Sequence, residues 1–392
     1  MKVVLVSPNA SRQMGGEAIK AFQYFEYLLG TDFDAYLITH SRCRDELEGL
    51  FPANRLIFVE DGFWQALFWR SGVLSFLITV YFHLVAAKLI QAFEQDTTIV
   101  HYLCPISPVQ LRFPPKGYDI IMGPFSGAIH FPPAFRGRMP LIRRLNEKFH
   151  QMSQWILGYL VGDKKKARVV LVSGYERTHR SLLAAGCQPE RLIDVVDSGV
   201  PDSISNAERI RHAGVSGRFI CSCRLINLKG IDLAIRALAF TPETVSLTIC
   251  GDGPERAALE SIVDDLGLSK RVDFKGWLDH SQLLQTLRGH RGFVFPSLAD
   301  ANGIAVQEAM MIGLPVIALR WGGPAHLADD TSAWYVDPTS EDAVINGLAQ
   351  AMTKLSADGE KADQISAAAR KIAESRFTWK DVAASWSACY KP

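Results

Sequence analysis

Two carboxylates stand eight positions apart between two apolar runs, and a helix-like stretch begins between them. Asp300 follows the strand-like run GFVFPS (292–297), so its side chain can reach a hydroxyl of a ligand bound beyond the strand. Glu308 falls about one turn into the helix and can accept hydrogen bonds from a vicinal diol such as ribose. The helix is expected to begin with four residues whose backbone N–H groups point at an anion: Asn302, Gly303, Ile304 and Ala305. This spacing predicts a site for an anion that carries hydroxyl groups.

Two cations, Arg224 and Lys229, flank a short loop after the strand-like run GRFICSC (217–223). The loop ends in Gly230, where another helix is expected to start. A guanidinium fork and an ammonium point charge beside a helix N-terminus suit a diphosphate. The alternative is a pair of surface bases without a ligand, and these residues alone leave that open.

Glycines follow two further strand-like runs. Gly251 and Gly253 lie in GDGPE, and Gly15 and Gly16 directly precede a helix-like stretch after KVVLVS (2–7). Glycine at such a position lets the backbone approach a phosphate or a nucleoside closely, although a tight turn alone also explains it. No strand end supplies the pattern GxGxxG, which argues against a nicotinamide or flavin site.

The elements that must position these residues alternate along the whole chain. Val/Ile-rich runs, expected as buried parallel strands, are separated by amphipathic helical stretches. Besides the three runs named above, the expected strands are 33–39, 97–103, 118–123, 167–173, 191–199, 245–253, 271–276 and 315–320. This alternation predicts an α/β fold with parallel sheets covered by helices on both faces, which bind ligands beyond the carboxyl ends of the strands.

The length of 392 residues predicts more than one domain. A polar stretch at 197–217 is the expected boundary, and it divides the chain into domains 1–200 and 201–375. A final segment, 376–392, is expected to form a helix that packs back on the first domain.

Composition excludes several classes of protein. Apolar residues make up 48% of the chain and charged residues 21%, so disorder is not expected. The net charge of +1 by itself says nothing about partners, and a nucleic-acid partner is not expected. The seven cysteines include no CxxC pair, so a disulfide framework or zinc site is not expected. With no signal-peptide pattern at the N-terminus, the expected location is the cytoplasm.

Two segments raise the question of a membrane. The aromatic, apolar segment 63–93 is too interrupted to span a bilayer, and it reads either as a buried helix or as an interfacial docking element. Residues 136–180 hold eleven bases and three acids, which predicts either a solvated basic face or a surface for anionic lipid or substrate. Peripheral contact with the inner face of the plasma membrane therefore stays open.

Taken together, these motifs resemble the retaining glycosyltransferases of family 4, also called group 1, which have the GT-B fold. The resemblance covers residues 217–340 strongly and the N-terminal half loosely, through Gly15 and Gly16. The motifs that carry it occur in the family's order: Arg224-x4-Lys229-Gly230, Gly251-Asp252-Gly253-Pro254, Pro296-Ser297, Gly313-Leu314-Pro315-Val316 and Gly322-Gly323. The implied fold is a pair of Rossmann-like, doubly wound domains facing across a cleft, the first binding the acceptor and the second the donor.

The resemblance implies a nucleotide-diphosphate sugar, with uridine or guanosine as the expected nucleoside, as donor substrate. Arg224 and Lys229 would neutralise the departing diphosphate, Glu308 would hold the ribose, and no metal or other cofactor is expected. Asp300 would contact hydroxyls of the sugar. It stands where the family's E-x7-E pattern has Glu, which puts the choice of sugar in doubt.

The remaining implied roles concern the phosphates and the acceptor. The backbone of residues 303–305 and of Gly16 would approach the phosphates. A histidine frequent in the family after the 118–123 strand is absent here, where the sequence reads GPFSG, and His101 and His130 are the expected substitutes.

The expected reaction is transfer of a hexose to a glycan or lipid-linked acceptor, in polysaccharide, exopolysaccharide or lipopolysaccharide biosynthesis. Two alternatives stay open: a sugar-nucleotide epimerase with the same fold, and a non-catalytic protein that binds nucleotide sugars.

Overall fold

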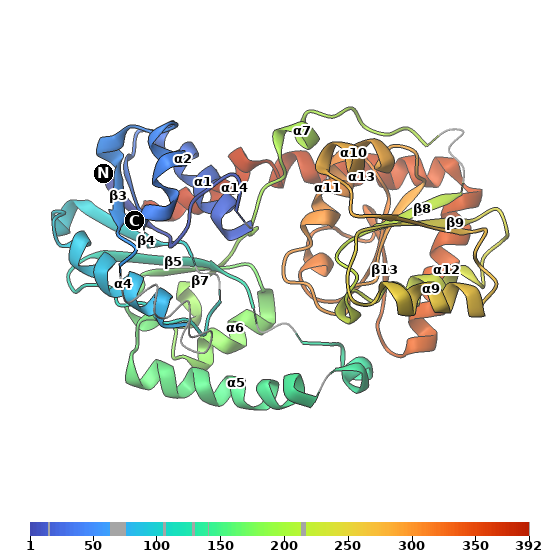
Figure 1. Cartoon of the computed structure of the whole chain (residues 1–392), viewed down its shortest axis with the longest axis horizontal. Coiled ribbons are helices and arrows are strands. Elements are labelled where there is room, and N and C mark those ends of the chain that lie inside the picture. The colour runs from blue at the N-terminus through green and yellow to red at the C-terminus, as the bar shows by residue number, and fades with distance from the viewer. Residues whose placement is uncertain are drawn as a thin grey trace. The chain divides into compact units, whose positions relative to one another are not determined.

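Two parallel sheets organise the chain in the computed structural model, which describes residues 1–14, 16–62, 76–104, 107–127, 130–139, 141–212 and 217–391. Each sheet belongs to its own unit (Figure 1). The first unit is built from Met1–Ala128, Asn146–Asp197 and Val382–Pro392, and the second from Ile129–Leu145 and Ser198–Asp381. Neither unit is therefore one continuous stretch of chain.

In the first unit, the described residues form a seven-stranded parallel sheet. Its strands, in spatial order, are β3 (Leu56–Val59), β2 (Asp34–His40), β1 (Lys2–Val6), β4 (Thr98–Tyr102), β5 (Asp119–Phe125), β6 (Val169–Val172) and β7 (Leu192–Asp194). Its helices include α1 (Gly16–Leu29), α2 (Arg44–Glu48), α4 (Phe76–Ile90) and α6 (Tyr175–Ala184), and α5 (Leu141–Leu160) joins it from residue 146 onward. The strand order reverses direction between β1 and β4, which is where doubly wound sheets bind ligands.

In the second unit, the described residues form a six-stranded parallel sheet. Its strands, in spatial order, are β10 (Val272–Gly276), β9 (Ser246–Cys250), β8 (Arg218–Ser222), β11 (Gly292–Phe295), β12 (Val316–Leu319) and β13 (Ala333–Val336). Its helices include α7 (Asp202–Ser205), α8 (Ile231–Leu238), α9 (Arg256–Asp265), α10 (His280–Leu287), α11 (Ile304–Ile312), α12 (Glu341–Ala357) and α13 (Gly359–Arg376), whereas α14 (Trp379–Ser387) belongs to the first unit from Val382 onward. The reversal here lies between β8 and β11.

Apolar runs explain both sheets. All residues of β11 and β12 are buried, as expected for strands that are covered by helices on both faces. On β1, Val4 pairs with Tyr36 on one side and with Val100 on the other, and these central strands pack into the core of the first unit. The predicted α/β architecture of two parallel-sheet domains is confirmed.

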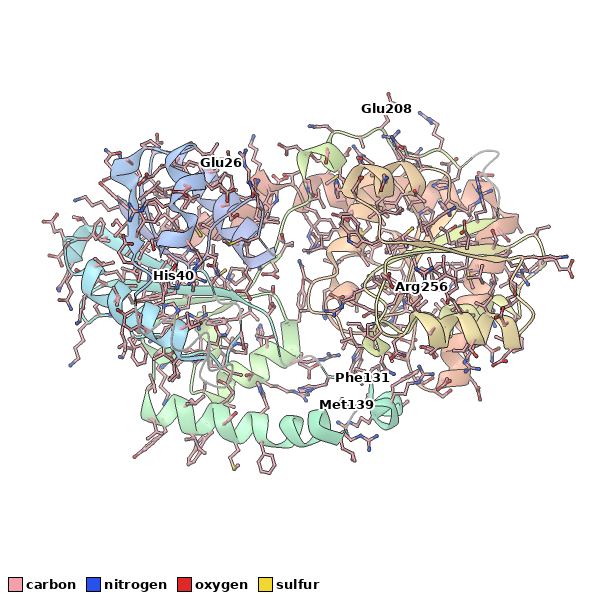
Figure 2. All side chains as sticks on the ribbon, viewed as in Figure 1. Glu26, His40, Phe131, Met139, Glu208 and Arg256 are labelled. Carbon is pink, nitrogen blue, oxygen red and sulfur yellow. The ribbon has the colours of Figure 1, made fainter. Side chains whose placement is uncertain are left out.

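The segment around a short 3-10 helix, Pro133–Arg138, lies with the second unit although the chain returns to the first unit directly afterwards. Phe131, Phe135 and Met139 are buried in the core of the second unit, and Phe131 and Met139 are labelled in Figure 2. The guanidinium of Arg138 pairs with Asp232 at 2.8 Å and with Glu341 at 2.7 Å. Apolar burial and two ion pairs thus fix this segment to the second unit.

The chain's last residues lie in the first unit from Val382 onward. Trp386 is fully buried there, and its indole N–H donates to the carbonyl oxygen of Val196 at 2.9 Å. The units depart from the predicted bounds at 200 and 375 in three places, because residues 130–145, 198–200 and 376–381 lie with the second unit. The last residues lie with the first unit from Val382 onward, in agreement with the segment 376–392 that was expected to pack back on that domain, whereas the placement of residues 130–145 has no counterpart in the predicted domains.

The segment 63–93 is described from residue 76, and its first part, including Phe63 and Trp64, lies outside the described residues. Phe82, Ala86 and Ile90 of α4 are buried in the core of the first unit. Within the described part of the chain, no helix is long and apolar enough to cross a bilayer.

Candidate functional site

A cavity of about 460 Å³ opens at the carboxyl ends of β8, β9 and β10 in the second unit. That volume falls within the range of small-molecule sites. The residues lining it come from the three loops and from α10: Ser222, Cys223, Arg224, Cys250, Gly251, Asp252, Trp277, Leu278 and Leu283. Apolar walls with a few polar groups suit a flat ring bearing hydrogen-bonding atoms, such as a nucleobase.

The loop after β8 carries the two predicted cations. Arg224 is exposed at the cavity and makes no ion pair within the described residues. Lys229 ends a 3-10 turn, and Gly230 follows with φ 62°, in the left-handed region that favours glycine. A Cβ at Gly230 would lie 2.3 Å from the carbonyl oxygen of Pro296, so the loop after β8 packs directly against the loop after β11.

The ammonium of Lys229 donates to the Asp300 carboxylate at 2.5 Å. The side chains of Lys229 and Asp300 are only 18% and 16% exposed, so water screens this ion pair less than a surface pair. The same ammonium lies 5.4 Å from the centre of the Phe295 ring, over its face. The lysine is therefore held in place by an acid and a ring before any ligand arrives.

Asp300 also forms the start of α11. Its second carboxylate oxygen accepts the backbone N–H of Gly303 at 2.8 Å and that of Asn302 at 3.2 Å. Gly303 precedes the helix with φ 70°, and the next two residues, Ile304 and Ala305, begin it. Helix geometry gives their N–H groups no acceptor inside the helix, so they remain available to an anion.

Gly322 and Gly323, after β12, fasten the same loop from the other side. The N–H of Gly323 donates to the carbonyl oxygen of Asp300 at 3.0 Å. A Cβ would lie 2.5 Å from that oxygen at Gly322 and 1.9 Å from the carbonyl oxygen of Ala301 at Gly323. The paired glycines are therefore required by the close approach of two loops, which fixes where Asp300 stands.

The glycines after β9 serve a similar purpose. Gly251 has φ 124°, and a Cβ there would lie 1.9 Å from the carbonyl oxygen of Cys223. A Cβ at Gly253 would lie 2.3 Å from the carbonyl oxygen of Leu225. Both glycines are thus explained by loop packing, and Gly251 in addition lines the cavity.

Glu308 lies one turn into α11, with its side chain 14% exposed, and His280 stands beside it. The nearest atoms, Nε2 of His280 and Oε1 of Glu308, are 3.7 Å apart. The Glu308 carboxylate raises the pKa of His280 above its ordinary value, because it stabilises the charged ring. His280 begins α10, whose Leu283 lines the cavity, so this helix connects the cavity with Glu308.

The sequence reasoning missed His280, and one signal was available for it. Asp279 precedes Gln282 by three positions, and this capping box marks the first turn of a helix. The side chain of His280, next to the cap, is therefore expected to point outward. Nothing in the sequence indicated that this turn lies beside Glu308.

In the first unit, Gly15 lies outside the described residues, and Gly16 begins α1. A Cβ at Gly16 would meet no protein atom within 4 Å. Packing within the described chain therefore does not require glycine there, unlike at Gly251 or Gly323, and room for a ligand is left beside the backbone.

His101 lies on β4 and is fully buried. Its Nε2 is 2.8 Å from the carbonyl oxygen of Gly123, which can only accept, so Nε2 carries the proton. Its Nδ1, 2.7 Å from the Tyr390 hydroxyl, then accepts a hydrogen bond, and Tyr390 accepts one from Tyr24. Burial lowers the pKa of His101 to about 4. The ring is neutral with both nitrogens engaged, which favours a structural role over contact with an acceptor.

His130 lies in the second unit, whereas His101 lies in the first. Its carbonyl oxygen accepts the indole N–H of Trp321 at 2.9 Å, which ties the segment before Phe131 to the loop after β12. His130 thus adjoins the Gly322–Gly323 loop through its backbone.

The structure brings together most of the predicted residues of the second unit. Hydrogen bonds link Lys229, Asp300, Asn302 and Gly303, whereas Arg224 and Gly251 line the adjoining cavity. Cys223 lines the cavity and lies close enough to Lys229 and Asp300 for their charges to affect the pKa of its thiol. Burial is the main cause that raises this pKa to about 12. The arrangement provides two cations, free helix N–H groups and a carboxylate, which together suit a nucleoside diphosphate.

Part of the chain is similar to a known family of proteins. Residues 206–372 match the family described as glycosyl transferases group 1. A GDP-mannose-dependent alpha-(1-6)-phosphatidylinositol monomannoside mannosyltransferase of Mycolicibacterium smegmatis is 29% identical over 230 residues, 54% of this chain and 59% of that protein. The lipopolysaccharide core biosynthesis glycosyltransferase LpsD of Rhizobium meliloti is 32% identical over 159 residues, 41% of this chain and 45% of that protein. The matches span about half the length of these relatives, and they support the predicted transferase class.

Solved structures share the whole fold. The crystal structure of HepE from Anabaena in complex with UDP aligns over 100% of this chain and 99% of its own, with a TM-score of 0.67 and 17% identity. At this identity the likeness shows the fold alone, and it confirms the predicted GT-B class of two Rossmann-like domains. Residues 206–372, which make up most of the second unit, are thus similar to the glycosyl transferases group 1, on a two-domain fold that extends over the entire chain.

Proposed function

We propose that the protein is a retaining glycosyltransferase that moves a hexose from a nucleoside-diphosphate sugar to a glycan or lipid-linked acceptor. The observation that carries this proposal is the Lys229–Asp300 ion pair at the N-terminus of α11, beside a cavity at which Arg224 is exposed. The HepE structure contains UDP, and the mannosyltransferase relative is named for its use of GDP-mannose, so a UDP- or GDP-sugar is the proposed donor.

Different residues of the second unit contact different parts of the donor. The cavity walls receive the base, and Glu308 accepts from the ribose hydroxyls. Arg224, Lys229 and the N–H groups at the start of α11 hold the diphosphate, whose negative charge grows as the sugar leaves. These fixed positive groups perform the role that a metal ion has in other phosphate sites.

The proposed reaction breaks the bond between the anomeric carbon of the sugar and the diphosphate oxygen, which keeps the electron pair. An acceptor hydroxyl forms the new bond on the same face, and its proton passes to the departing diphosphate. Asp300 binds Lys229 through one oxygen and the start of α11 through the other. A donor phosphate that binds Lys229 in place of Asp300 would leave that carboxylate oxygen of Asp300 available to a sugar hydroxyl.

The acceptor is proposed by likeness. The two curated relatives are named for a phosphatidylinositol mannoside and for the lipopolysaccharide core, so the proposed acceptor is a growing glycan, free or lipid-linked, of a surface polysaccharide. We propose on the same grounds that the protein works in the cytoplasm, in peripheral contact with the inner face of the plasma membrane.

The test begins with a panel of UDP- and GDP-sugars incubated with the full chain in the absence of acceptor. Slow release of free sugar and nucleoside diphosphate is the expected result. Formation of a 2-epimer would instead identify an epimerase, and binding without any turnover, with or without glycan acceptors, would identify a non-catalytic protein. Either of these outcomes overturns the proposal.

Lys229→Ala makes the test specific to the site. Loss of a charge-assisted contact should raise the Kd for UDP or GDP roughly tenfold to a hundredfold, and turnover should fall at least as far. Lys270→Ala, at an exposed position away from the site, is the matched control and should change neither quantity. An unchanged nucleotide Kd in Lys229→Ala, measured by titration calorimetry, would remove the phosphate role.

A further inference from the structure

Helix α5 presents its apolar side chains to solvent. From residue 149 to residue 160 the exposed large residues are Phe149, Met152, Trp155, Ile156, Tyr159 and Leu160. Trp155, Tyr159 and Leu160 are 65%, 78% and 70% exposed. At about 100° per residue these six positions fall within one arc of roughly 140°, so they form a continuous stripe along the helix. This stripe is called the outer face of α5 below.

The opposite side of α5 is the more polar one. Gln154 and Gly158 are buried, and the imidazole Nε2 of half-buried His150 is 2.9 Å from the Ser181 hydroxyl on α6. A Cβ at Gly158 would lie 2.2 Å from the carbonyl oxygen of Ala185, so α5 approaches the end of α6 closely along this side. The usual amphipathic arrangement, apolar inward and polar outward, is therefore reversed. Figure 2 shows side chains that project from α5 away from the sheet of the first unit.

Charge at the end of the helix adds a second observation. The twelve residues 149–160, FHQMSQWILGYL, contain no Asp, Glu, Lys or Arg. Lys165 and Lys166, five and six positions after the end of α5, are exposed, and neither makes an ion pair within the described chain. An uncharged apolar stripe that carries Trp and Tyr, followed by free cations, matches the boundary of an anionic bilayer, where aromatic rings occupy the headgroup level and lysines meet lipid phosphates.

We propose that the outer face of α5 docks the protein on the surface of an anionic lipid bilayer, with the helix lying in the interface rather than across it. Twelve residues span too little of a bilayer for a crossing helix, and an apolar arc of this width suits shallow immersion. Scattered surface hydrophobic residues need no explanation, but six in one stripe mark an interaction site. The aromatic tips and the exposed cations that follow the helix in the sequence favour a lipid surface over a second copy of the chain.

The proposal is independent of the donor site. It would hold under any catalytic activity, and if the acceptor is lipid-linked, it places the first unit at the surface where that acceptor resides.

Vesicle binding tests the docking face. The full chain should sediment with vesicles of phosphatidylcholine and phosphatidylglycerol, and less with phosphatidylcholine alone. The double variant Trp155→Ala/Tyr159→Ala should lower the partition coefficient about tenfold, because two interfacial rings are lost. Phe240→Ala, at an aromatic residue 67% exposed in the second unit, is the matched control and should bind as the unchanged protein does.

The lysines test the electrostatic part. Lys165→Gln/Lys166→Gln should weaken binding to the anionic vesicles roughly fivefold for each charge removed and leave binding to neutral vesicles unchanged. Lys270→Gln/Lys371→Gln removes two exposed charges elsewhere and should have no such effect.

Two results would overturn the proposal. One is equal vesicle binding by the Trp155/Tyr159 variant and the unchanged protein, with thermal unfolding showing both to be folded. The other is a lipid-free dimer, seen by light scattering, that the same variant converts to a monomer, since the outer face would then belong to a second copy.

Discussion

The loops at the carboxyl ends of the two sheets differ in how tightly they are built. In the second unit, glycines at 251, 322 and 323 bring backbones so close that no Cβ fits, and Lys229 is already paired with Asp300. In the first unit, Gly16 faces open space, and His101 is buried with both ring nitrogens hydrogen-bonded. Among these described residues, the loops of the second unit are therefore fixed by close backbone packing and an ion pair, whereas the first unit leaves space beside Gly16.

The largest expected effect contrasts two glycines. Gly251→Ala places a Cβ against the carbonyl oxygen of Cys223 at a φ of 124°, and should lower the free energy of unfolding by on the order of 4 kcal/mol. Gly16→Ala should change it by less than about 0.5 kcal/mol, since the new Cβ meets nothing and alanine suits a first helical position. Urea unfolding of the full chain measures both values.

The same pair separates packing from ligand approach. If Gly16→Ala weakens nucleotide-sugar binding while stability is unchanged, the glycine serves the ligand. Equal losses of stability in the two variants would contradict the contrast between the two units.

A histidine in each unit provides the second test, because His101 and His280 should change the stability with pH in opposite directions. The pKa of His101 is lowered to about 4 in the folded chain. Below about pH 6.5 the unfolded chain therefore binds a proton at this residue that the folded chain does not bind. Its contribution to stability is present above about pH 6.5 and is lost as the pH falls towards about 4, by on the order of 2–3 kcal/mol. Urea unfolding between about pH 4 and pH 7 should show a shallower pH dependence for His101→Gln than for the unchanged protein.

His280 should behave in the reverse way. Because Glu308 raises the pKa of His280, its stabilising contribution is present below about pH 6.5 and is lost as the pH rises through the raised value. The side chain is 43% exposed, so solvent screening leaves only a few tenths of a kcal/mol. His280→Gln should remove this small slope, and a slope of the same sign as that of His101 would refute the assigned pairing.

The last test concerns the two contacts of Asp300. Asp300→Asn keeps an oxygen for the N–H of Gly303 but removes the charge opposite Lys229. Asp300→Ala removes both, and should be less stable than the Asn variant by about 1 kcal/mol, the usual cost of losing such a cap. Neither variant should weaken the binding of free UDP or GDP, because a competitor for Lys229 has been removed, whereas sugar transfer should fall in both. Equal stability of the two variants would show that the capping oxygen contributes nothing.

Sequence patterns predicted the repeated part of the architecture. Buried parallel strands are continuous apolar runs, so the central strands of both sheets were identifiable. The edge strands β3, LIFV, and β13, AWYV, were not predicted, because four residues flanked by polar segments resemble many loops. The residues proposed for the donor site were predictable because each follows a strand, and parallel strands end at one edge.

Other features depend on tertiary structure that no local pattern encodes. The distances between Arg224, Lys229 and Asp300 follow from how loops pack, and the burial of His101 follows from Tyr390, which lies 289 positions away. The outer face of α5 has the apolar periodicity of a core helix, so the sequence alone indicates an inward orientation.

The order of segments along the chain does not follow the order of the units, and this restricts how the protein can be cut. A fragment that stops before Val382 would omit Trp386 and Tyr390 and leave the interior of the N-terminal half open to water. A fragment that starts after Asp197 would lack Phe131, Phe135 and Met139, which fill part of the interior of the other half. No single break among the described residues separates two halves that each keep these interior side chains, so a tag or reporter should not divide the chain at one point.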